Sequence, residues 1–402
     1  MSLTETTTAW VPPSFDLLKD PELVEKLEPI QDPQNFVRIA KWSAIQVSGR
    51  VDGFGSMRGF FLYDGEHRSS NTTTTEDDSQ NAQLVLRQPS PIVDFLWYPT
   101  ASSRDHSTFC FVSSVRESPV KLLDASNGRL RASYPIIDHR ERFIAPHSLA
   151  FNLYGTRLYC GFEDAIEVFD VGQPGEGTRL PTTPSKKSKD GLKGIISALA
   201  FCPSYTSDYY AAGSLTPTDS NVALFSETQG EIPVMFLSGG PKAGITQLQF
   251  NPMQPHMIYA SFRRQNVIYS WDMRGTVDMP IAIYSLPQGS EEPTNQKRRF
   301  DVDISGHWLA FGSQSGNIHF FDLNTIATDG SIPTIEPALT YKAHDDSIGC
   351  VAFRPTSAEL LSVSGSRNYP SSDSEEDEDD EVVLNRSRKP VTRDRSIKLW
   401  HL

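Results

Sequence analysis

The stretch SGNIHFFDLN, from Ser315 to Asn324, decides the fold class of this chain. After a Ser-Gly turn, small or polar residues alternate with bulky apolar ones until the stretch closes on the pair Phe321-Asp322. Alternation with a period of two is typical of a β-strand that buries one face. Six other apolar runs close on a related pair, at Tyr63-Asp64, Leu123-Asp124, Phe169-Asp170, Phe225-Ser226, Trp271-Asp272 and Trp400-His401. The chain therefore contains seven copies of one strand pattern.

A second landmark precedes each pair, an aromatic or apolar residue that closes a short apolar run, usually before a Pro or Gly turn. These residues are Trp42, Trp97, Phe151, Phe201, Phe250, Val302 and Phe353. The steps between them are 55, 54, 50, 49, 52 and 51 residues. A near-constant period of this size, with several short strands per unit, is typical of a β-propeller, whose small sheets stack around a ring. We therefore predict an all-β, seven-bladed WD40 β-propeller with disordered loop insertions.

The units fill almost the whole chain, so we expect one propeller over residues 36–402, preceded by an N-terminal arm at residues 1–35. The chain ends on the third strand of the last unit, which then lacks its outermost strand. Because ETTTAW is β-prone, we predict that residues 6–11 supply this strand and close the ring, which removes an exposed sheet edge. Elsewhere in the arm, DPELVEKLEPI (20–30) has weak helical character.

An insertion at residues 368–393 interrupts the last unit. It contains an acidic run, SSDSEEDEDDE, whose eight carboxylates carry most of the chain's net charge of −13, followed by the basic run RSRKPVTR. Ser372 and Ser374 each have a carboxylate three residues later, a pattern that acidophilic kinases favour, so both are candidate phosphorylation sites. The simpler alternative is a solvated, disordered loop.

The composition excludes several classes of protein. No segment approaches the ~20 apolar residues of a membrane span, and the N-terminus lacks the features of a signal peptide. The four cysteines occur singly, without metal-ligand spacing or a disulfide framework, so we expect an intracellular protein with reduced thiols. No phosphate loop, HExxH motif or dinucleotide turn is present. We therefore expect neither catalysis nor a cofactor nor a bound metal.

The last unit contains a His-Ser-Asp-Trp set at His344, Ser362, Asp394 and Trp400. In WD repeats such a set forms a buried hydrogen-bond chain that ties strands together. A hydrolase triad is the alternative for a His, a Ser and an Asp, but no nucleophile elbow is present. We predict the structural set, and because no other unit contains all four residues, the propeller is divergent.

Basic residues concentrate in loops that a propeller places on one of its faces. Such loops join the outer strand of one blade to the inner strand of the next, or the second strand to the third. The residues are Arg116, Arg263, Arg264, Lys297, Arg298, Arg299 and Arg367. A rim of Arg and Lys can hold phosphates, and guanidinium planes can stack on unpaired bases. The rim therefore predicts RNA binding, while the alternative is that each Arg is an ordinary exposed turn residue.

Several long segments resemble the telomerase Cajal body protein family, WD-repeat proteins that bind small Cajal-body RNAs and telomerase RNA. The resemblance covers roughly residues 35–367, and because the chain lacks the long low-complexity extensions of other members, it resembles the compact fungal members. The segments are SSVRESPVKLLDASNGRLRASY (113–134), APHSLAFNLYGTRLYCGF (145–162), GIISALAFCPS (194–204), GITQLQFNP (244–252), WDMR (271–274), TNQKRRFDVDISGHWLAFGSQSG (294–316) and the SGSR before the acidic run. QNFVRIAKW (34–42) is similar to the family's first inner strand.

The resemblance implies binding of a short loop element in box H/ACA small RNAs, or of spliceosomal small nuclear RNA. It also implies roles in small nuclear ribonucleoprotein biogenesis and splicing more than in telomere maintenance. The implied partners are ribonucleoprotein proteins, coilin, the survival-motor-neuron complex and the cytosolic chaperonin that assists folding. The implied location is the nucleus, in a nuclear body where the organism has one, with a cytoplasmic folding stage. Matched residue by residue, the family's RNA-binding positions fall on Phe36, Arg116, Arg274 and either Lys297 or Arg298.

A different class of function is a protein-only adaptor. WDMR fits the WD-x-Arg pattern by which some propellers dock on a cullin-ligase adaptor, so the chain could present substrates to a ligase. Affinity purification separates the two hypotheses, because ligase subunits without RNA favour the adaptor.

Overall fold

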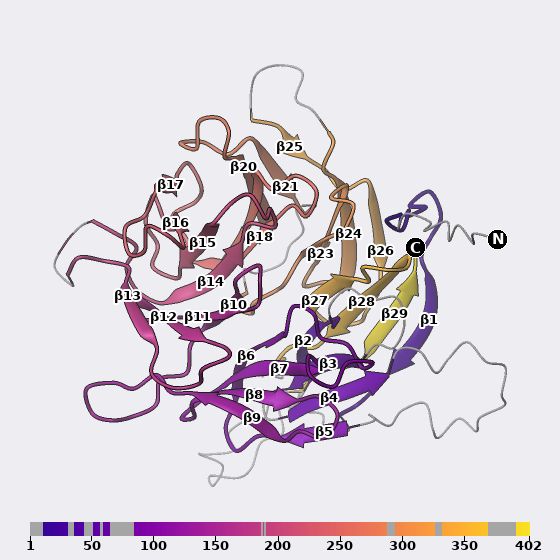
Figure 1. The fold of residues 1–402 in the computed structure, drawn as a ribbon. Helices are drawn as coiled ribbons and strands as arrows, with labels where there is room; N and C mark the ends of the chain where they lie inside the picture. The colour runs from indigo at the N-terminus through magenta and orange to yellow at the C-terminus, as the bar shows by residue number, and fades with distance from the viewer. Residues whose placement is uncertain are drawn as a thin grey trace, which may run out of the picture.

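The computed structural model describes residues 11–30, 36–43, 51–56, 59–64, 84–185, 188, 190–287, 294–325, 332–368 and 391–402. In this part of the chain the regular elements are β-strands, and they form seven sheets (Figure 1). None of the described segments is a helix long and apolar enough to cross a membrane. The prediction of an all-β, WD40-like β-propeller is confirmed.

We number the sheets in chain order of their inner strands. Sheet 1 contains β2 (Val37–Lys41), β3 (Val51–Ser56), β4 (Gly59–Asp64) and β5 (Leu84–Arg87). Sheet 2 contains β6 (Ile92–Trp97), β7 (Cys110–Val115), β8 (Val120–Asp124) and β9 (Leu130–Tyr134). Sheet 3 contains β10 (Ser148–Phe151), β11 (Arg157–Phe162), β12 (Ala165–Asp170) and β13 (Thr178–Pro181). Sheet 4 contains β14 (Ile196–Phe201), β15 (Tyr209–Ser214), β16 (Val222–Ser226) and β17 (Met235–Leu237).

The remaining sheets show where the repeat varies. Sheet 5 contains β18 (Ile245–Phe250), β19 (Met257–Phe262), β20 (Val267–Asp272), β21 (Ala282–Ser285) and β25 (Thr334–Ile335). Sheet 6 contains β22 (Asp301–Val302), β23 (Trp308–Gly312), β24 (Asn317–Asp322) and β26 (Leu339–Lys342). Sheet 7 contains β27 (Ile348–Phe353), β28 (Glu359–Ser364), β29 (Ile397–His401) and β1 (Glu22–Leu27). Six sheets thus have the regular four strands, and sheet 5 has a fifth because β25 adds in parallel to β21.

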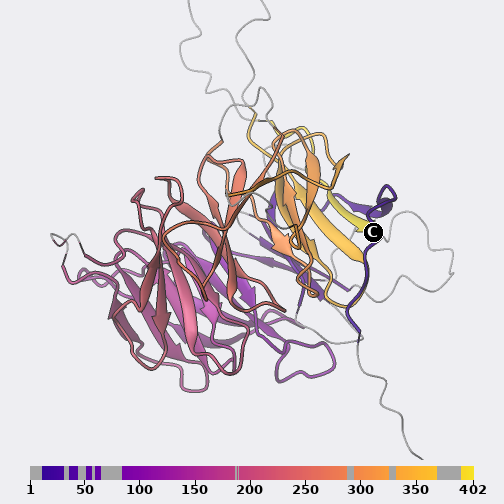
Figure 2. The ribbon, with the colours of Figure 1, turned by 90° about the horizontal axis from the view of Figure 1, so that it is seen from above.

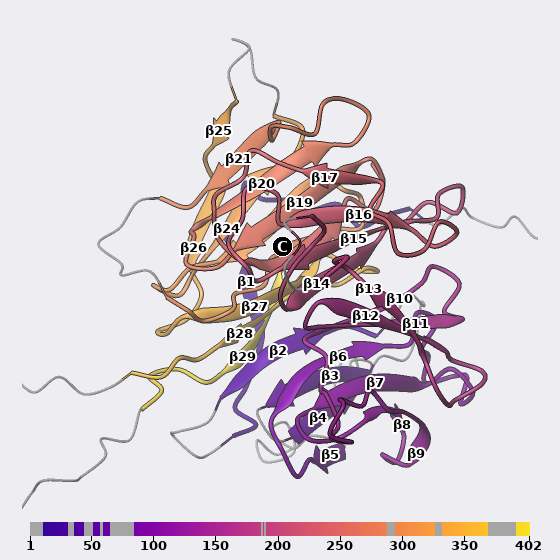
Figure 3. The same ribbon diagram turned by 90° about the vertical axis from the view of Figure 1, so that its left-hand side faces the viewer.

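Direct hydrogen bonds join neighbouring sheets around the ring. In order from the contact between sheets 1 and 2, they are Arg38 Nη2 to Ile92 O (3.1 Å), Ser114 Oγ to Pro146 O (2.7 Å), Ser148 Oγ to Ile196 O (2.8 Å), Ser197 Oγ to Ile245 O (2.6 Å), Gln247 Nε2 to Phe300 O (2.8 Å), Arg299 N to Gly349 O (2.9 Å) and Cys350 Sγ to Ala40 O (3.4 Å). The last bond returns to sheet 1, so the sheets follow one another around a closed ring, which Figures 2 and 3 show from two further directions.

The aromatic-acidic pairs end the third strand of a sheet for two separate reasons. The first residue of the pair is buried between sheets, as for Phe169 and Phe321. The acidic residue makes the turn to the fourth strand: Asp170 Oδ1 accepts the N–H of Gly172 at 2.8 Å, and Asp322 Oδ1 accepts that of Asn324 at 2.9 Å. An Asp side chain that accepts its own backbone two residues on reverses the chain. One residue therefore packs the core, and the next turns the strand away from it.

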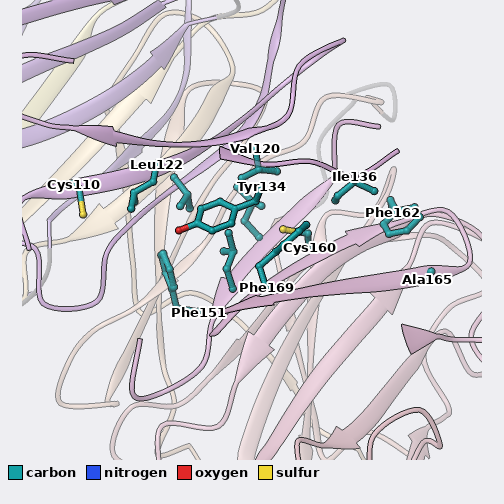
Figure 4. Close-up of a cluster of buried hydrophobic side chains, with 13 residues drawn as sticks. Cys110, Val120, Leu122, Tyr134, Ile136, Phe151, Cys160, Phe162, Ala165 and Phe169 are labelled. Atoms are coloured by element: carbon teal, nitrogen blue, oxygen red, sulfur yellow. The ribbon is translucent and has the colours of Figure 1, made fainter. Parts of the chain in front are cut away.

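The core lies between neighbouring sheets. Figure 4 shows the cluster between sheets 2 and 3, where Tyr134 and Phe169 face each other with ring centroids 5.4 Å apart. Leu122 from sheet 2 and Phe151 from sheet 3 are buried in the same cluster. Burying one such side chain stabilises the fold by roughly 1.5–3 kcal/mol. Each sheet therefore depends on its neighbours for a core.

The strand that closes the ring is not the one that the sequence predicted. Antiparallel pairing joins β29 to β28 on one side and to β1 on the other, with Glu22 opposite His401 and Leu27 opposite Ile397 (Figure 1). Both edges of β29 are thereby occupied, so the prediction that residues 6–11 form this strand is wrong. Residues 6–10 lie outside the described residues, and Val11 is not in a strand. The weak helical character of residues 20–30 is overridden by the free edge of β29, which offers backbone partners that a helix would leave unused.

The predicted insertion in the last unit lies between β28 and β29. Residues 369–390 of it are outside the described residues, and so are the candidate phosphorylation sites Ser372 and Ser374. Its two ends meet in an antiparallel bridge between Asn368 and Val391. Asp346 Oδ2 accepts the side-chain amide of Asn368 at 3.1 Å and the backbone N–H of Arg393 at 2.9 Å. The insertion therefore starts and ends at one fixed point of sheet 7.

Candidate nucleic-acid interface

One end of the propeller carries the turns in which the sequence places its basic residues. At this end the inner strands β2, β6, β10, β14, β18, β22 and β27 begin. Strand pairing puts Ile92 opposite Val115, Ile245 opposite Phe262 and Ile348 opposite Ser364, so β7, β19 and β28 end where the inner strands start. We call this end the basic face.

Four predicted residues lie exposed in turns on the basic face. They are Arg116 after β7, Arg263 and Arg264 after β19, and Arg367 after β28. Arg264 has a φ of 62°, and Glu117, at the corresponding position after β7, has a φ of 58°. Tight hairpin turns require such left-handed residues, although residues other than Gly and Asn seldom adopt them. The structure brings these arginines to one face from three different sheets.

The segment before β22 brings two further cations, Lys297 and Arg299, to the basic face. Arg299 forms a parallel bridge with Cys350, and its backbone N–H donates to Gly349 O at 2.9 Å. This segment therefore runs beside β27 instead of staying with sheet 6. From there Arg299 Nη2 reaches Asp94 Oδ1 of sheet 2 at 3.1 Å, and Lys41 Nζ of sheet 1 reaches the same oxygen at 3.2 Å. Three sheets thus contribute one charge each to a buried group.

Asp94 is the carboxylate that these cations share. Burial alone would raise the pKa of Asp94, but the charges of Arg299, Lys41 and Lys297 outweigh it and hold this pKa at about 2. For Lys41, burial outweighs the attraction of Asp94 and lowers the pKa of the ammonium. Asp94 is therefore ionised throughout the physiological range, and it partly neutralises a region that is otherwise positive.

Arg38 and Lys297 complete a cluster of positive charge. The guanidinium of Arg38 donates from Nη2 to Ile92 O at 3.1 Å, while its Nε is buried without a hydrogen-bond partner. Burial and the charges of Arg299, Arg367 and Arg116 lower the pKa of Arg38. The Lys297 side chain is accessible to solvent, but many protein atoms lie around its ammonium group and partly desolvate it. This desolvation and the charge of Arg299 lower the pKa of Lys297 to about 8. We call Arg38, Arg116, Lys297, Arg299 and Arg367 the mouth cluster.

Beneath the mouth cluster the inner strands of all seven sheets line a central channel. Its cavity of about 390 Å³ is lined by Lys41, Asp94 and Arg299, and by polar side chains such as Gln247 and Gln249. Both glutamines are held by protein partners, Gln247 by Phe300 and Gln249 by Asp301. The cavity therefore contains the ion pairs of Asp94 with Lys41 and Arg299 beside the polar side chains of sheet 5.

Sequence reasoning missed Arg38 and Lys41, although both lie in the quoted segment QNFVRIAKW. Strand alternation alone gives no reason to place them with Arg299. Pairing of β2 with β3 shifts between Val37 and Ile39, and β6, β14, β18 and β27 show a shift at the corresponding place. A bulge of this kind re-aims a side chain. For Arg38, the available signal was its place as the second residue of an inner strand, where the bulge lies.

Three predicted RNA-binding residues do not join the exposed group. Arg298 is buried, donates to Gly312 O at 3.1 Å and Gln265 O at 3.3 Å, and covers the Phe311 ring at 5.0 Å, so it ties sheet 5 to sheet 6. Phe36 is buried beneath Gly365, where an added Cβ would lie 2.4 Å from its ring.

Arg274 is the third. It follows β20, which runs from the basic face to the opposite end, and its Nη2 pairs with Asp272 Oδ2 at 2.7 Å. Arg274 and Arg116 therefore do not share a face, because the two residues follow strands that end at opposite ends of the propeller.

The His-Ser-Asp-Trp set forms a continuous hydrogen-bond chain in sheet 7. His344 Nδ1 lies 3.1 Å from Asp394 Oδ2, and His344 Nε2 lies 2.8 Å from Ser362 Oγ. Trp400 Nε1 donates to the same Ser362 oxygen at 2.8 Å. Since an ionised carboxylate only accepts, His344 donates from Nδ1 and accepts at Nε2. The hydrogen bond from His344 holds the pKa of Asp394 well below its usual value despite burial. These contacts agree with the structural interpretation of the set.

Comparison with known proteins gives a consistent family. No protein-family profile matches the sequence. The chain is 35% identical over 287 residues to Telomerase Cajal body protein 1 of Rattus norvegicus, which is 71% of this chain and 51% of that protein. It is 34% identical over 379 residues to the Bos taurus protein of the same name, 92% of this chain and 66% of the relative. It is also 28% identical over 240 residues to Guanine nucleotide-binding protein negative regulator 1 of Schizosaccharomyces pombe, 58% of each chain. The chain thus spans about half to two thirds of the length of these relatives.

Proposed function

Because this chain belongs to the telomerase Cajal body protein family, we propose that it is a non-enzymatic WD-repeat scaffold that binds RNA through its basic face. The RNA class we propose is small nuclear or Cajal-body RNA, of box H/ACA or spliceosomal type. The function is then the biogenesis and localisation of small nuclear ribonucleoproteins and pre-mRNA splicing, with the telomerase ribonucleoprotein as a further client.

The observation that carries this proposal is the distribution of cations on the basic face. Arg116, Arg263 and Arg264 are exposed there, and the charges of the mouth cluster act on one another across four sheets. Phosphate groups of RNA neutralise such a surface and release their counterions, which drives binding. An exposed arginine also offers a flat guanidinium on which an unpaired base can stack.

The basic face is not positive all the way round. The turn after β11 in sheet 3 carries Glu163 and Asp164 at the positions that hold Arg263 and Arg264 in sheet 5. Carboxylates repel an RNA backbone, so we propose that the RNA crosses the mouth between sheets 5 and 2 and avoids sheet 3. This path is short, which suits a single-stranded loop better than a long duplex.

The test is binding of fluorescently labelled box H/ACA RNA and spliceosomal small nuclear RNA to the purified chain, followed by crosslinking and mapping of the attached peptides. We expect saturable binding that weakens steeply with salt, and crosslinks in the segments 36–43, 113–118, 261–266 and 294–300. Crosslinks confined to the opposite end, or no binding at low salt, would overturn the proposal.

We further propose a nuclear location and assembly with ribonucleoprotein proteins, coilin and the survival-motor-neuron complex, after chaperonin-assisted folding. Purification from cells separates this proposal from the protein-only adaptor. Because β20 ends at Asp272, the WDMR motif lies at the end opposite the basic face, so ligase subunits without RNA would point to that end.

A further inference from the structure

The mouth cluster holds more positive charge than its local carboxylate neutralises. Asp94 is paired with Lys41 and Arg299. The same carboxylate also attracts the charges of Arg38 and Lys297. Like charges that converge in a partly desolvated place cost free energy, unless an opposite charge joins them. The buried Nε of Arg38 is also a donor without an acceptor, which adds a desolvation cost.

We propose that the mouth of the central channel contains a discrete binding site for one phosphate group, formed by Arg38, Lys297 and Arg299. The ligand class is a phosphate ester or a small polyphosphate anion. The site adds to the proposed RNA-binding face, but it does not require that RNA be the natural ligand.

The backbone explains why these three cations meet. A Cβ on Gly349 would lie 3.0 Å from the carbonyl oxygen of Arg38 and 3.7 Å from the side-chain nitrogen of Gln296. The start of sheet 1 and the segment before β22 therefore both lie next to this glycine in sheet 7. The Gln296 amide donates to Gly365 O at 2.7 Å, which fixes the segment where Lys297 leaves it. The cations are thus positioned by backbone contacts, and binding would not have to order them.

The chemistry of the site matches an anion with several acceptor oxygens. Arg38 contributes a guanidinium charge, Arg299 a guanidinium that Asp94 occupies on one side, and Lys297 an exposed ammonium. Guanidinium groups present donors in a fork that fits phosphate oxygens, while an ammonium acts as a point charge. In the polar cavity below, Gln247 and Gln249 are already held by protein, and the carboxylates of Asp94 and Asp301 already accept hydrogen bonds from protein donors.

Binding of an anion should depend on pH through Lys297. The charged groups that act on Lys297 are Arg299 on its own segment, Arg38 on β2 and Asp94 on β6, and the imidazole of His147 in sheet 3 feels its charge in turn. Burial lowers the pKa of His147 below its usual value, so this residue stays neutral above pH 7. With a pKa of about 8, Lys297 loses its charge between pH 7 and pH 9, and anion affinity falls with it.

Calorimetric titration of the full chain with sodium sulfate, at constant ionic strength in chloride, tests the site. Sulfate keeps its charge over this pH range, so any pH dependence belongs to the protein. We expect one saturable site whose affinity falls about tenfold in Lys297→Gln and in Arg38→Gln. The matched control is Arg263→Gln, which removes an exposed cation from the same face outside the cluster and should change affinity less than about twofold.

Lys297→Arg keeps the charge at high pH, so its sulfate affinity should stay level from pH 7 to pH 9 while that of the unaltered chain drops severalfold. Lys297→Gln and Lys297→Arg change only an exposed side chain, so their comparison tests the site whether or not Arg38→Gln folds. No saturable binding, or equal losses in Lys297→Gln and Arg263→Gln, would overturn the site.

Competition identifies the source of the phosphate. If labelled RNA displaces sulfate, the site holds a backbone phosphate of the RNA. If sulfate and RNA bind independently, or if sulfate binds and RNA does not, the site takes a small free anion such as pyrophosphate, which is then titrated in place of sulfate. Sulfate binding without any RNA binding would overturn the proposed RNA-binding function and leave the phosphate site in place.

Discussion

The two ends of the propeller carry the same residue type in different electrostatic states. At the end opposite the basic face, Arg131 pairs with Asp124 at 2.7 Å and Arg274 pairs with Asp272 at 2.7 Å. Both partners are the acidic residues that end a third strand. On the basic face, the second strands β7 and β19 end at Val115 and Phe262, and Arg116 and Arg263 follow them directly, with no acidic residue at the end of either strand.

This difference has a simple cause in the repeat. The Asp of each aromatic-acidic pair is needed to make the turn to the fourth strand, so it places a carboxylate at one end of the sheet. Arg131 and Arg274 pair with such a carboxylate, although their exposures differ. No such requirement acts on the turn between the second and third strands. The repeat therefore does not require a carboxylate beside the arginines in that turn, and the following predictions test this comparison.

The largest effect is expected from reversing charge on the basic face. The triple variant Arg116→Glu, Arg263→Glu, Arg264→Glu should weaken RNA binding roughly 100- to 1,000-fold at moderate salt, because three phosphate contacts become repulsive. Fluorescence anisotropy measures the affinity.

The matched control reverses three exposed arginines at the opposite end, Arg104→Glu, Arg129→Glu and Arg157→Glu, with the same change in net charge. Its affinity should fall less than about threefold. Equal losses in the two variants would mean that net charge, and not the basic face, determines binding.

Removing His344 separates stability from binding. His344→Ala leaves the Asp394 carboxylate without its histidine partner and breaks the bond to Ser362, which should lower the free energy of unfolding by about 3 kcal/mol. Chemical denaturation measures this loss. RNA affinity of the folded protein should stay within about twofold, since sheet 7 keeps its place in the ring. A variant as stable as the parent would show that the hydrogen-bond chain contributes little.

A single substitution on the basic face should have a smaller and more specific effect. Arg263→Ala should cost about 1 kcal/mol of RNA binding and reduce the slope of log affinity against log salt by about one. Binding measured at four salt concentrations gives the slope. An unchanged slope with reduced affinity would indicate that Arg263 contacts a base and not a phosphate.

The smallest effect is expected from the corresponding change at the other end. Arg274→Ala removes a largely exposed ion pair, so neither the thermal stability nor the RNA affinity should change measurably. Thermal unfolding and anisotropy check both quantities. A clear loss of RNA binding would put Arg274 back among the contact residues and contradict the two-ended comparison.

The sequence predicted those features that depend on local pattern. Repeat spacing and strand alternation gave an all-β, WD40-like propeller, and the positions of His344, Ser362, Asp394 and Trp400 gave a set that the structure joins by hydrogen bonds. The turn positions of Arg116 and Arg263 on one face also followed from strand order. In each case the deciding signal is the order of strands and turns within a repeat or the regular spacing of the repeats, both of which the sequence shows directly.

Features that depend on which distant segments meet were not predictable in this way. Residues 22–27, and not residues 6–11, close the ring by pairing with the outer edge of β29. This contact joins segments from opposite ends of the sequence, so no local pattern specifies it. Arg298 is buried between sheets 5 and 6, whereas Arg38 belongs to the mouth cluster, and the sequence shows only an arginine at both positions.

The amino-acid sequence by itself determined a ring of repeated sheets, their turn chemistry and an excess of arginine in particular turns. Only the tertiary structure decided which strand completes the last sheet, which arginines are neutralised and which ones converge on the channel. The physical reason is range: strand periodicity and turns act over a few residues, whereas the charge of Arg299 meets that of Asp94 across 205 positions of chain and three sheets.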